Sequence, residues 1–510
     1  MRPGSAYPVT LALGALLTAR TYAEVPQFAR ESEWVEVRSP HLIVITDAGL
    51  GPGRATVDKL ERYAEALGRL NAGLRANPAV PATVIVFRDQ SEFAQYVPPG
   101  TEDAVAFFRP GDDRDRLVIS ASSPGESATS SVFHEFVHYL LAANFPAVPL
   151  WLNEGLAMYY STCRLHPTYA EFGQPDLPPA RWMRSHRLIS IEMMFAMNTA
   201  AAAYRRYNET QFVFYAESYL LTHYLQSTPA VTGHLDAYLL RLRRGARPMP
   251  AFHEEFPDSV WQPIATALEG YPDQIEFQAL RTVPVGPPPD ETERTLTPAE
   301  ALTSLGELMV TGNPMEDSAA AEHFHAALAV SPSYALATAW LGLIAELAGH
   351  TAEAEADYAR ALATGDTTPA VLDVVARGKL WRMQSESGES ASVDSMRMLA
   401  TAALELYRRA LRVDGADIEA LGGRGVALYA LGDASDSTAV EGLARAVDGR
   451  PRREDMAVAL AELRALQGRT REAVDLLRHR VVPIVPPSRV ESVNRRAVEL
   501  ESGAANDRKP

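Results

Sequence analysis

The order of apolar and polar positions in the first 125 residues predicts a small sheet with a helix packed on it. Residues 55–74 carry apolar side chains at helical spacing, which predicts an amphipathic helix. On either side of this segment, short runs rich in β-branched and apolar residues end at polar or proline breaks, which is typical of strands. The last two of these runs flank a polar Gly-Asp-Asp turn and predict a hairpin. The predicted strands span residues 34–39, 41–46, 82–87, 104–108 and 117–120.

A helical pattern replaces the strand pattern after residue 125. Apolar positions at helical spacing run through residues 133–141, and the helix is expected to end near Asn144-Phe145-Pro146. From residue 151 to about residue 283 the chain is again largely helical. The proline-rich run at residues 284–289 then predicts a linker, which we place at 284–297, between two domains.

Residues 298–483 repeat themselves at intervals close to the roughly 34 residues of tetratricopeptide arrays. Small residues let paired helices approach closely while Tyr or Phe fills the gap between neighbours, so such units are stable only when stacked. The polar, aperiodic residues 484–510 predict a disordered tail. The recurring positions are Leu305, Gly306, Ala320, Phe324, Ala327 and Pro332; Leu341, Gly342, Ala354, Tyr358 and Ala361; Ala403, Tyr407 and Ala410; Gly425, Leu443, Ala446 and Pro451; and, more weakly, Ala473 and Leu477.

Composition narrows the classes of function. The chain has 510 residues, 47% hydrophobic and 22% charged, which is ordinary for a globular protein of two or three domains. Its net charge of -16 disfavours nucleic acid as a partner. Cys163 is the only cysteine, so an internal disulfide and a cysteine-rich metal site are both excluded. Any bound metal must be held by histidines and carboxylates.

The N-terminus predicts export. Residues 1–23 contain Arg2, an apolar stretch and Thr21-Tyr22-Ala23 as a possible cleavage site, which together resemble a signal peptide. We therefore expect a periplasmic or secreted protein. No later segment reaches eighteen uninterrupted apolar residues, and no stable membrane span is expected.

The residues that carry chemistry are His134-Glu135-Phe136-Val137-His138. Residues four apart lie on one face of a helix, so His134 and His138 can present two imidazole nitrogens to one cation. Glu135 is placed beside that cation, where it can take a proton from water. The alternative interpretation is a buried structural pair of histidines. The helical context, the apolar residues inside the motif and a suitable third ligand downstream favour a zinc site.

That third ligand is predicted to be Glu154. It lies in Trp151-Leu152-Asn153-Glu154-Gly155, at the start of a second predicted helix. A turn over residues 144–149 would let this helix fold back on the first and bring the carboxylate to the metal. A zinc site needs a third protein ligand, which Glu154 would supply, and an open fourth position for water.

These segments, together with Phe214-Tyr215-Ala216-Glu217-Ser218-Tyr219-Leu220-Leu221, resemble the gluzincin metallopeptidases of the MA clan. In particular, the chain resembles bacterial peptidase-MA-like domains that are followed by tetratricopeptide repeats. The resemblance covers roughly residues 25–283, and the repeats cover residues 298–482. It implies an α+β zincin-like metallopeptidase domain followed by an all-α tetratricopeptide-type solenoid. It also implies Zn²⁺ held by His134, His138 and Glu154, with Glu135 as general base.

The resemblance is incomplete at one position. Many gluzincins carry an aspartate four residues after the third ligand, and this chain has Met158 there, so the sequence does not identify the partner that would orient a histidine. In a peptidase the oxyanion also needs a second hydrogen-bond donor. Tyr215 is the candidate donor, with a core aromatic as the alternative interpretation, and His223 is a weaker candidate.

Two functions remain open from the sequence. The first is a zinc-dependent peptidase that hydrolyses peptide bonds, with the repeats binding a protein or peptide partner. The second is a non-catalytic adaptor, in which the tetratricopeptide array binds a peptide and the zinc domain is structural. Glu135 discriminates between them, because a structural zinc site has no use for a base at that position. A repeat protein without any metal would require the whole motif to be accidental.

Overall fold

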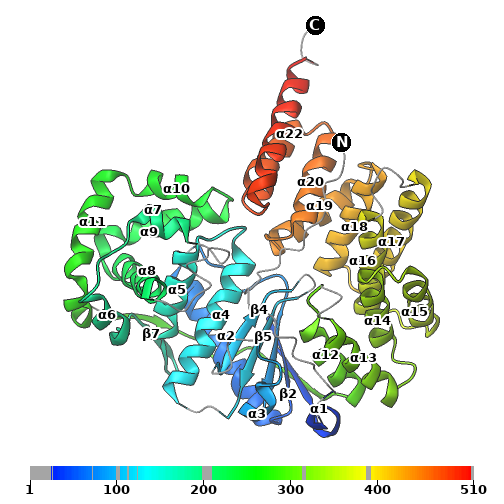
Figure 1. Ribbon diagram of the computed structural model, residues 1–510, viewed down its shortest axis with the longest axis horizontal. Helices are drawn as coiled ribbons and strands as arrows, with labels where there is room; N and C mark the ends of the chain where they lie inside the picture. The colour runs from blue at the N-terminus through cyan, green and yellow to red at the C-terminus, as the bar shows by residue number, and fades with distance from the viewer. Residues whose placement is uncertain are drawn as a thin grey trace. The chain divides into compact units, whose positions relative to one another are not determined.

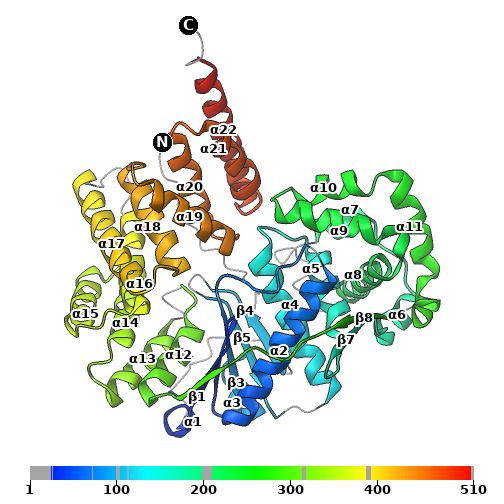
Figure 2. The same cartoon turned by 180° about the vertical axis from the view of Figure 1, so that it is seen from behind.

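The computed structural model is shown from two opposite sides in Figures 1 and 2. The chain divides into two compact units, one of residues 35–294 and the other of residues 295–506 together with residues 25–34. The predicted signal peptide at residues 1–23 lies outside the part that the structure describes. The described residues are 25, 27–71, 73–98, 104–111, 114–122, 125–197, 209–278, 280–312, 317–385 and 392–506.

A six-stranded mixed sheet forms the frame of the first unit. The three inner strands β5, β3 and β2 run parallel, and β4 pairs antiparallel with β5 to form one edge of the sheet. The five strands predicted from the pattern are all present, and the predicted hairpin is β4 with β5. In order across the sheet the strands are β4 (Ala106–Arg109), β5 (Arg116–Ser120), β3 (Ala82–Phe87), β2 (Leu42–Thr46), β1 (Val35–Arg38) and β9 (Thr292–Thr295).

Two long helices pack on this sheet. Helix α2 (Leu50–Leu70) contacts β1 and β2, and helix α4 (Glu126–Asn144) contacts β4 and β5. The ring of Tyr63 in α2 stacks on that of Phe133 in α4, with centroids 3.8 Å apart. Both rings are fully buried. This aromatic pair fixes the position of the helix that carries His134.

Helices make up most of the remainder of this unit. Helix α5 (Leu150–Ser161) packs on α4 and on α8 (Glu209–Ser227). A three-stranded sheet that the helical pattern did not predict joins β6 (Arg164–Leu165), β7 (Tyr169–Phe172) and β8 (Arg281–Pro284). The other helices are α3 (Gln90–Phe93), α6 (Leu177–Met183), α7 (Ile191–Ala196), α9 (Pro229–Arg243), α10 (Pro248–Glu255) and α11 (Asp258–Gly270), followed by the 3₁₀ turns Tyr271–Asp273 and Ile275–Phe277.

The predicted linker, residues 284–297, contains the boundary between the two units, and much of it is held by contacts to the first unit. Strand β8 pairs with β7, the N–H of Gly286 donates to Glu65 Oε2 at 2.9 Å, and β9 adds to the large sheet. Proline lacks a backbone N–H but still offers its C=O, so it is tolerated in the short strand β8. The two units divide after Arg294, inside the predicted 284–297 stretch.

The second unit is an array of stacked helix pairs. Within each pair the two helices pack together, and the first helix of a pair also packs on the first helix of the next. The short helix α1 (Gln27–Glu31) contacts α12 at the start of the array. The helices are α12 (Pro298–Met309), α13 (Ser318–Val330), α14 (Ala335–Leu347), α15 (Thr351–Ala363), α16 (Pro369–Ser385), α17 (Val393–Val413), α18 (Ile418–Leu431), α19 (Ser437–Gly449), α20 (Glu454–Leu466), α21 (Thr470–Leu476) and α22 (Pro487–Asn506), with a π-helical turn at Leu477–Val481.

Glycine and aromatic residues pack between the helices as the repeat pattern predicted. A Cβ atom added at Gly306 would lie 2.6 Å from the ring of Phe324, and one at Gly342 would lie 2.8 Å from the ring of Tyr358. These distances are too short for real carbon contacts. Glycine is therefore what allows the two helices of a pair to approach so closely.

The C-terminal segment is not disordered between residues 487 and 506, where it forms helix α22. Val493 and Ala497 are buried four residues apart on its inner side, and α22 contacts α21. Arg496 forms an ion pair with Glu462 of α20 at 2.8 Å. Only these two of the described side chains of α22 are buried, so the polar composition of the segment gave no sign of a helix. None of the described helices is long and apolar enough to cross a membrane.

Candidate metal centre

Helix α4 places His134 and His138 on the same face, one turn apart. Their Nε2 atoms are 3.0 Å from each other, and their rings lie almost perpendicular, at 86°. The side chains are partly covered, with 25% and 14% of their surface exposed. This arrangement follows directly from the four-residue spacing in the sequence. It leaves both nitrogens directed at one point.

Glu154 reaches the same point from α5. Its Oε2 atom lies 3.7 Å from Nε2 of His134 and 3.8 Å from Nε2 of His138. Helix α5 packs on both α4 and α8 at this position (Figure 1). A Cβ atom at the next residue, Gly155, would lie 2.1 Å from Thr222 Oγ1 of α8. The glycine therefore allows the close approach of α5 to α8 that sets the place of Glu154.

Asn153 supplies the orienting contact that the sequence did not identify. Its Oδ1 atom lies 3.1 Å from Nδ1 of His138, so the imidazole can donate from Nδ1 and keep the lone pair of Nε2 for a cation. Asn153 directly precedes Glu154, and the same turn of α5 therefore provides a carboxylate near both imidazoles and a hydrogen-bond partner of one of them. Met158 has no hydrogen-bonding group that could orient a histidine. The amide oxygen of Asn153 can orient His138 instead.

Glu135 lies next to His134 on α4 and is held by a separate contact. Its Oε2 atom accepts a hydrogen bond of 2.9 Å from the backbone N–H of Phe108, in the edge strand β4. Ligand atoms of His134, Glu135 and His138 all lie within 4.8 Å of one another. The backbone of β4 thus fixes the carboxylate of Glu135 close to the metal position. This contact was also not predicted, because it depends on how the edge strand lies over α4.

Burial sets the protonation of these groups. It raises the pKa of Glu154 to about 8 and lowers the pKa of His134 well below 6.5, with the charge of His138 adding to the second effect. Burial also raises the pKa of Glu135; the negative charge of Glu154 adds to this rise, while His138 and the Phe108 N–H oppose it. Imidazoles bind a metal in their neutral form, and a carboxylate must lose its proton to do so.

The residues fit a zinc ion. Two nitrogens bound to one tetrahedral zinc at roughly 2.0–2.1 Å would be about 3.3 Å apart, close to the 3.0 Å between the two imidazoles. Two imidazole nitrogens and one carboxylate oxygen are a usual donor set for zinc, and a site of three protein ligands keeps a fourth position open. Among the described residues, the one group of three potential ligand atoms within 4.8 Å of one another is His134, Glu135 and His138, and Glu154 Oε2 lies beside both imidazoles of this group.

The two candidates for an oxyanion donor differ in their surroundings. Tyr215 lies on α8, partly buried against the core, with its ring 5.8 Å from that of Phe214. Its role remains a prediction. His223 is fully buried and does not fit the role, because Nδ1 lies 2.7 Å from Tyr271 Oη and Nε2 lies 3.3 Å from Gly173 O. His223 is a core residue that ties α8 to the chain around it.

Comparison with known proteins leaves the family open. No family model matches the chain, and no curated protein matches its sequence. Among solved structures, the one entitled "Crystal Structure of the Yeast Tom70" aligns with 66% of this chain and 71% of its own, at 14% identity and a TM-score of 0.29. A TM-score this low does not establish a common fold.

Proposed function

We propose that this chain is a zinc-dependent peptidase of the gluzincin type. One observation carries the proposal: Glu154, from a separate helix, lies within 3.8 Å of both imidazole nitrogens, while Glu135 remains beside them and is not needed as a ligand. His134, His138 and Glu154 would hold the metal. A bound zinc ion in such a site acidifies water and polarises a carbonyl group.

Glu135 would act as the general base. One of its oxygens is engaged by the Phe108 N–H, which leaves the other to accept a proton from water. Burial raises the pKa of Glu135, which makes its carboxylate a stronger base than that of an exposed glutamate. Tyr215 remains our candidate for the donor that stabilises the oxyanion.

The edge strand β4 favours an extended peptide as the substrate. Along this strand, backbone groups alternate between facing β5 and facing outward. The C=O of Val105 accepts from Ser120 N–H at 2.9 Å and faces β5, whereas Phe108 N–H faces Glu135. Ala106 and Phe108 therefore direct their backbone groups away from β5. A peptide that added to this edge as a further strand would pass the metal centre.

The repeat unit would bind a protein or peptide partner. Stacked helix pairs present extended surfaces that other proteins use for this purpose. The second candidate function, an adaptor with a non-catalytic zinc domain, depends on this unit alone. The base at Glu135 favours the enzyme over that alternative, because a structural zinc site requires only its ligands.

The substitution Glu135→Gln tests the proposal. It removes the base, keeps the side-chain shape and leaves all three ligands in place, so zinc should stay bound while cleavage of a peptide library falls by about 10²- to 10⁴-fold. Glu269→Gln, on the exposed surface of α11, is the matched control and should cleave like the wild type. Wild type that holds zinc but cleaves no peptide would favour the adaptor. Full activity in Glu135→Gln would exclude this residue as the base.

A further inference from the structure

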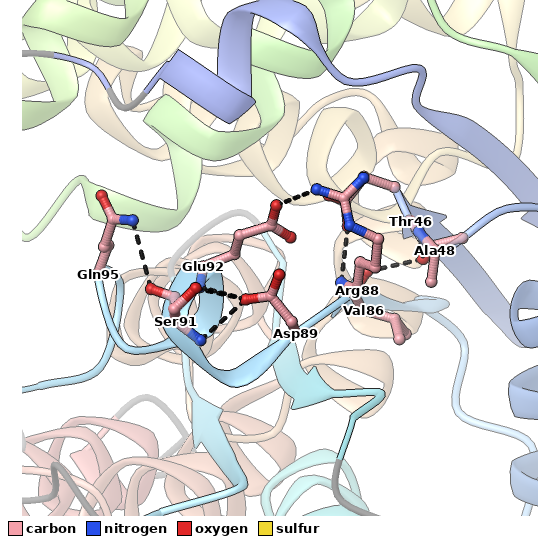
Figure 3. Close-up of polar contacts among 9 residues, drawn as sticks. Thr46, Ala48, Val86, Arg88, Asp89, Ser91, Glu92 and Gln95 are labelled. Atoms are coloured by element: carbon pink, nitrogen blue, oxygen red, sulfur yellow. Dashed lines mark hydrogen bonds and ion pairs between the residues drawn. The ribbon is translucent and has the colours of Figure 1, made fainter.

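A second cluster of charged residues lies where β2 and β3 end (Figure 3). Thr46 Oγ1 donates to Val86 O at 2.7 Å and joins the ends of the two strands. Asp47 follows directly, and its Oδ1 accepts from the backbone N–H of Arg88 at 2.8 Å. The guanidinium of Arg88 then reaches Glu92 of α3, whose Oε1 accepts a hydrogen bond from Nη2. These contacts bring two carboxyl groups to one arginine.

Each of the two carboxyl groups keeps one buried oxygen without a hydrogen-bond donor. These atoms are Asp47 Oδ2 and Glu92 Oε2, and neither is exposed to solvent. The whole side chain of Asp47 is inaccessible, and only 6% of that of Glu92 is exposed. A buried ionised oxygen that lacks a donor is costly, so an arrangement with both groups ionised is unfavourable.

The neighbouring charges do not remove this cost. Arg88 is the one cation that faces the pair among the described residues; its Nη2 is 3.9 Å from Asp47 Oδ2, and its side chain is 53% exposed. Tyr96, which follows α3, also faces the pair, and its pKa is raised by burial and by both carboxylates, so its hydroxyl stays neutral. Asp89 is engaged in capping α3 through Ser91 and the Glu92 N–H. Two carboxylates against one partly solvated arginine leave one negative charge in excess.

We propose that Asp47 and Glu92 share one proton in the folded protein, and that this proton closes the contact between α3 and the end of β2. A proton on one carboxyl group lets it donate a hydrogen bond to the other. This single hydrogen bond would involve both of the buried oxygens that lack a partner, Asp47 Oδ2 and Glu92 Oε2. With one shared proton, the net charge of Asp47, Glu92 and Arg88 together is zero. The end of the sheet at α3 is therefore a pH-sensitive contact that loosens as the pH rises.

The direction of this effect follows from the protonation of Glu92. Burial, and then the contact with Asp47, raise the pKa of Glu92 from 4.5 to about 7, while Arg88 opposes the rise. The folded protein thus holds the proton more tightly than the unfolded chain does. The stabilisation is complete below pH 4.5 and is lost as the pH rises through about 7. Gln90 Nε2 of α3 donates to Ala104 O, just before β4, at 2.8 Å. Opening of α3 should therefore also loosen the start of β4.

Hydrogen exchange of the full-length protein at pH 6 and pH 8, corrected for the intrinsic exchange rate, tests the proposal. In the wild type, protection of amides in α3 and at the end of β2 should fall by about tenfold between these pH values. Glu92→Gln removes the carboxyl group that titrates and should show a flat profile. Asp47→Asn supplies a permanent amide donor to Glu92 but leaves it buried, so its pH dependence should be weaker than that of the wild type. Glu269→Gln, the exposed control, should follow the wild type.

Two results would overturn the proposal. One is a wild-type pH profile that persists in Glu92→Gln, or that is unchanged in Asp47→Asn. The other is a protection at pH 8 that Ca²⁺ or Mg²⁺ restores in the wild type but not in Glu92→Gln, because the orphan oxygens would then hold a cation rather than a proton. Asp47→Asn provides the same comparison should Glu92→Gln not fold.

Discussion

The amide oxygen of Asn153 lies 3.1 Å from Nδ1 of His138, and the next residue along α5, Glu154, directs its carboxylate at Nε2 of the same imidazole. Two adjacent residues of one helix therefore act on opposite sides of one histidine. Asn153 fixes the orientation of the ring, and Glu154 places a carboxylate beside the nitrogen that would bind the proposed metal. A change at residue 153 should consequently affect metal binding without removing a ligand.

The first prediction concerns this contact. Asn153→Ala should weaken zinc binding by about 10- to 100-fold, since the loss of such an orienting partner has costs of this size in other metal sites. Competition with a chelator would measure the affinity. Asn153→Asp restores an acceptor for the Nδ1 proton and should recover most of the affinity. Equal zinc affinity in wild type and Asn153→Ala would show that His138 needs no orienting partner.

A second prediction concerns the glycine beside Glu154. The Cβ of Gly155→Ala would lie 2.1 Å from Thr222 Oγ1 and 2.4 Å from the backbone oxygen of Ser218, so α5 must move away from α8. Overpacking of this kind costs about 1–3 kcal/mol, and the shift should also lower zinc affinity because Glu154 moves with the helix. Thermal unfolding and chelator competition would measure the two effects.

The control for this substitution is Gly270→Ala, whose Cβ would lie 3.8 Å from its nearest neighbour, Gln274 Nε2. It should leave both quantities unchanged. A stable Gly155→Ala protein with undiminished zinc affinity would mean that the spacing of α5 and α8 does not set the position of the ligand.

Glu217 gives a prediction about pH. Its side chain is buried in α8, and Oε2 accepts from Ile189 N–H at 2.8 Å; burial raises its pKa from 4.5 to about 7, although this hydrogen bond opposes the rise. A carboxyl group with a raised pKa stabilises the fold below its unfolded pKa, and this stabilisation is lost as the pH rises through about 7. Between pH 5 and pH 8 the loss is on the order of 2–3 kcal/mol.

Glu217→Gln does not titrate and keeps an oxygen that can accept from Ile189 N–H. The difference in unfolding free energy between wild type and this variant should therefore move in favour of the variant from pH 5 to pH 8. Denaturant unfolding at several pH values would measure it. A difference that stays constant with pH would mean that Glu217 is ionised throughout the range.

The strands and the metal motif were predictable because each rests on a local pattern. Alternating or continuous apolar runs predicted the five strands from β1 to β5, and the spacing of His134 and His138 placed both on one face of α4. Strand β9, with the sequence Thr-Glu-Arg-Thr, is exposed at every position and has no apolar signal. Its pairing with β1 depends on the tertiary structure, which local patterns do not report.

The contacts that complete the site were not predictable for the same reason. Phe108 donates a backbone N–H to Glu135, and any residue except proline could do so. Asn153 was visible in the Asn-Glu-Gly segment, but its role depends on the angle at which α5 packs on α4. Chemistry that rests on side-chain identity can be found in the sequence, whereas contacts that rest on the relative position of two elements require the structure.

The last prediction concerns the packing of the repeat unit at Tyr358. This ring lies against two glycines, and a Cβ at Gly378 would lie only 1.9 Å from its hydroxyl oxygen. Gly378→Ala should therefore displace the ring and destabilise α14 to α17 by about 1–3 kcal/mol, because each helix pair buries its core only against its neighbours. Hydrogen exchange of peptides from these helices would measure the loss locally.

A second substitution separates this clash from a general effect of alanine. The hydroxyl of Tyr358 is buried without a hydrogen-bond partner among the described residues, so Tyr358→Phe alone should change stability little. When Tyr358→Phe is combined with Gly378→Ala, the hydroxyl oxygen that lies closest to the new Cβ of residue 378 is absent. The next ring atom, Cζ, is 2.6 Å from that Cβ. Tyr358→Phe should thus recover part of the stability lost in Gly378→Ala. Strict additivity of the two changes would contradict a direct contact, because residues that touch are coupled and distant residues are not.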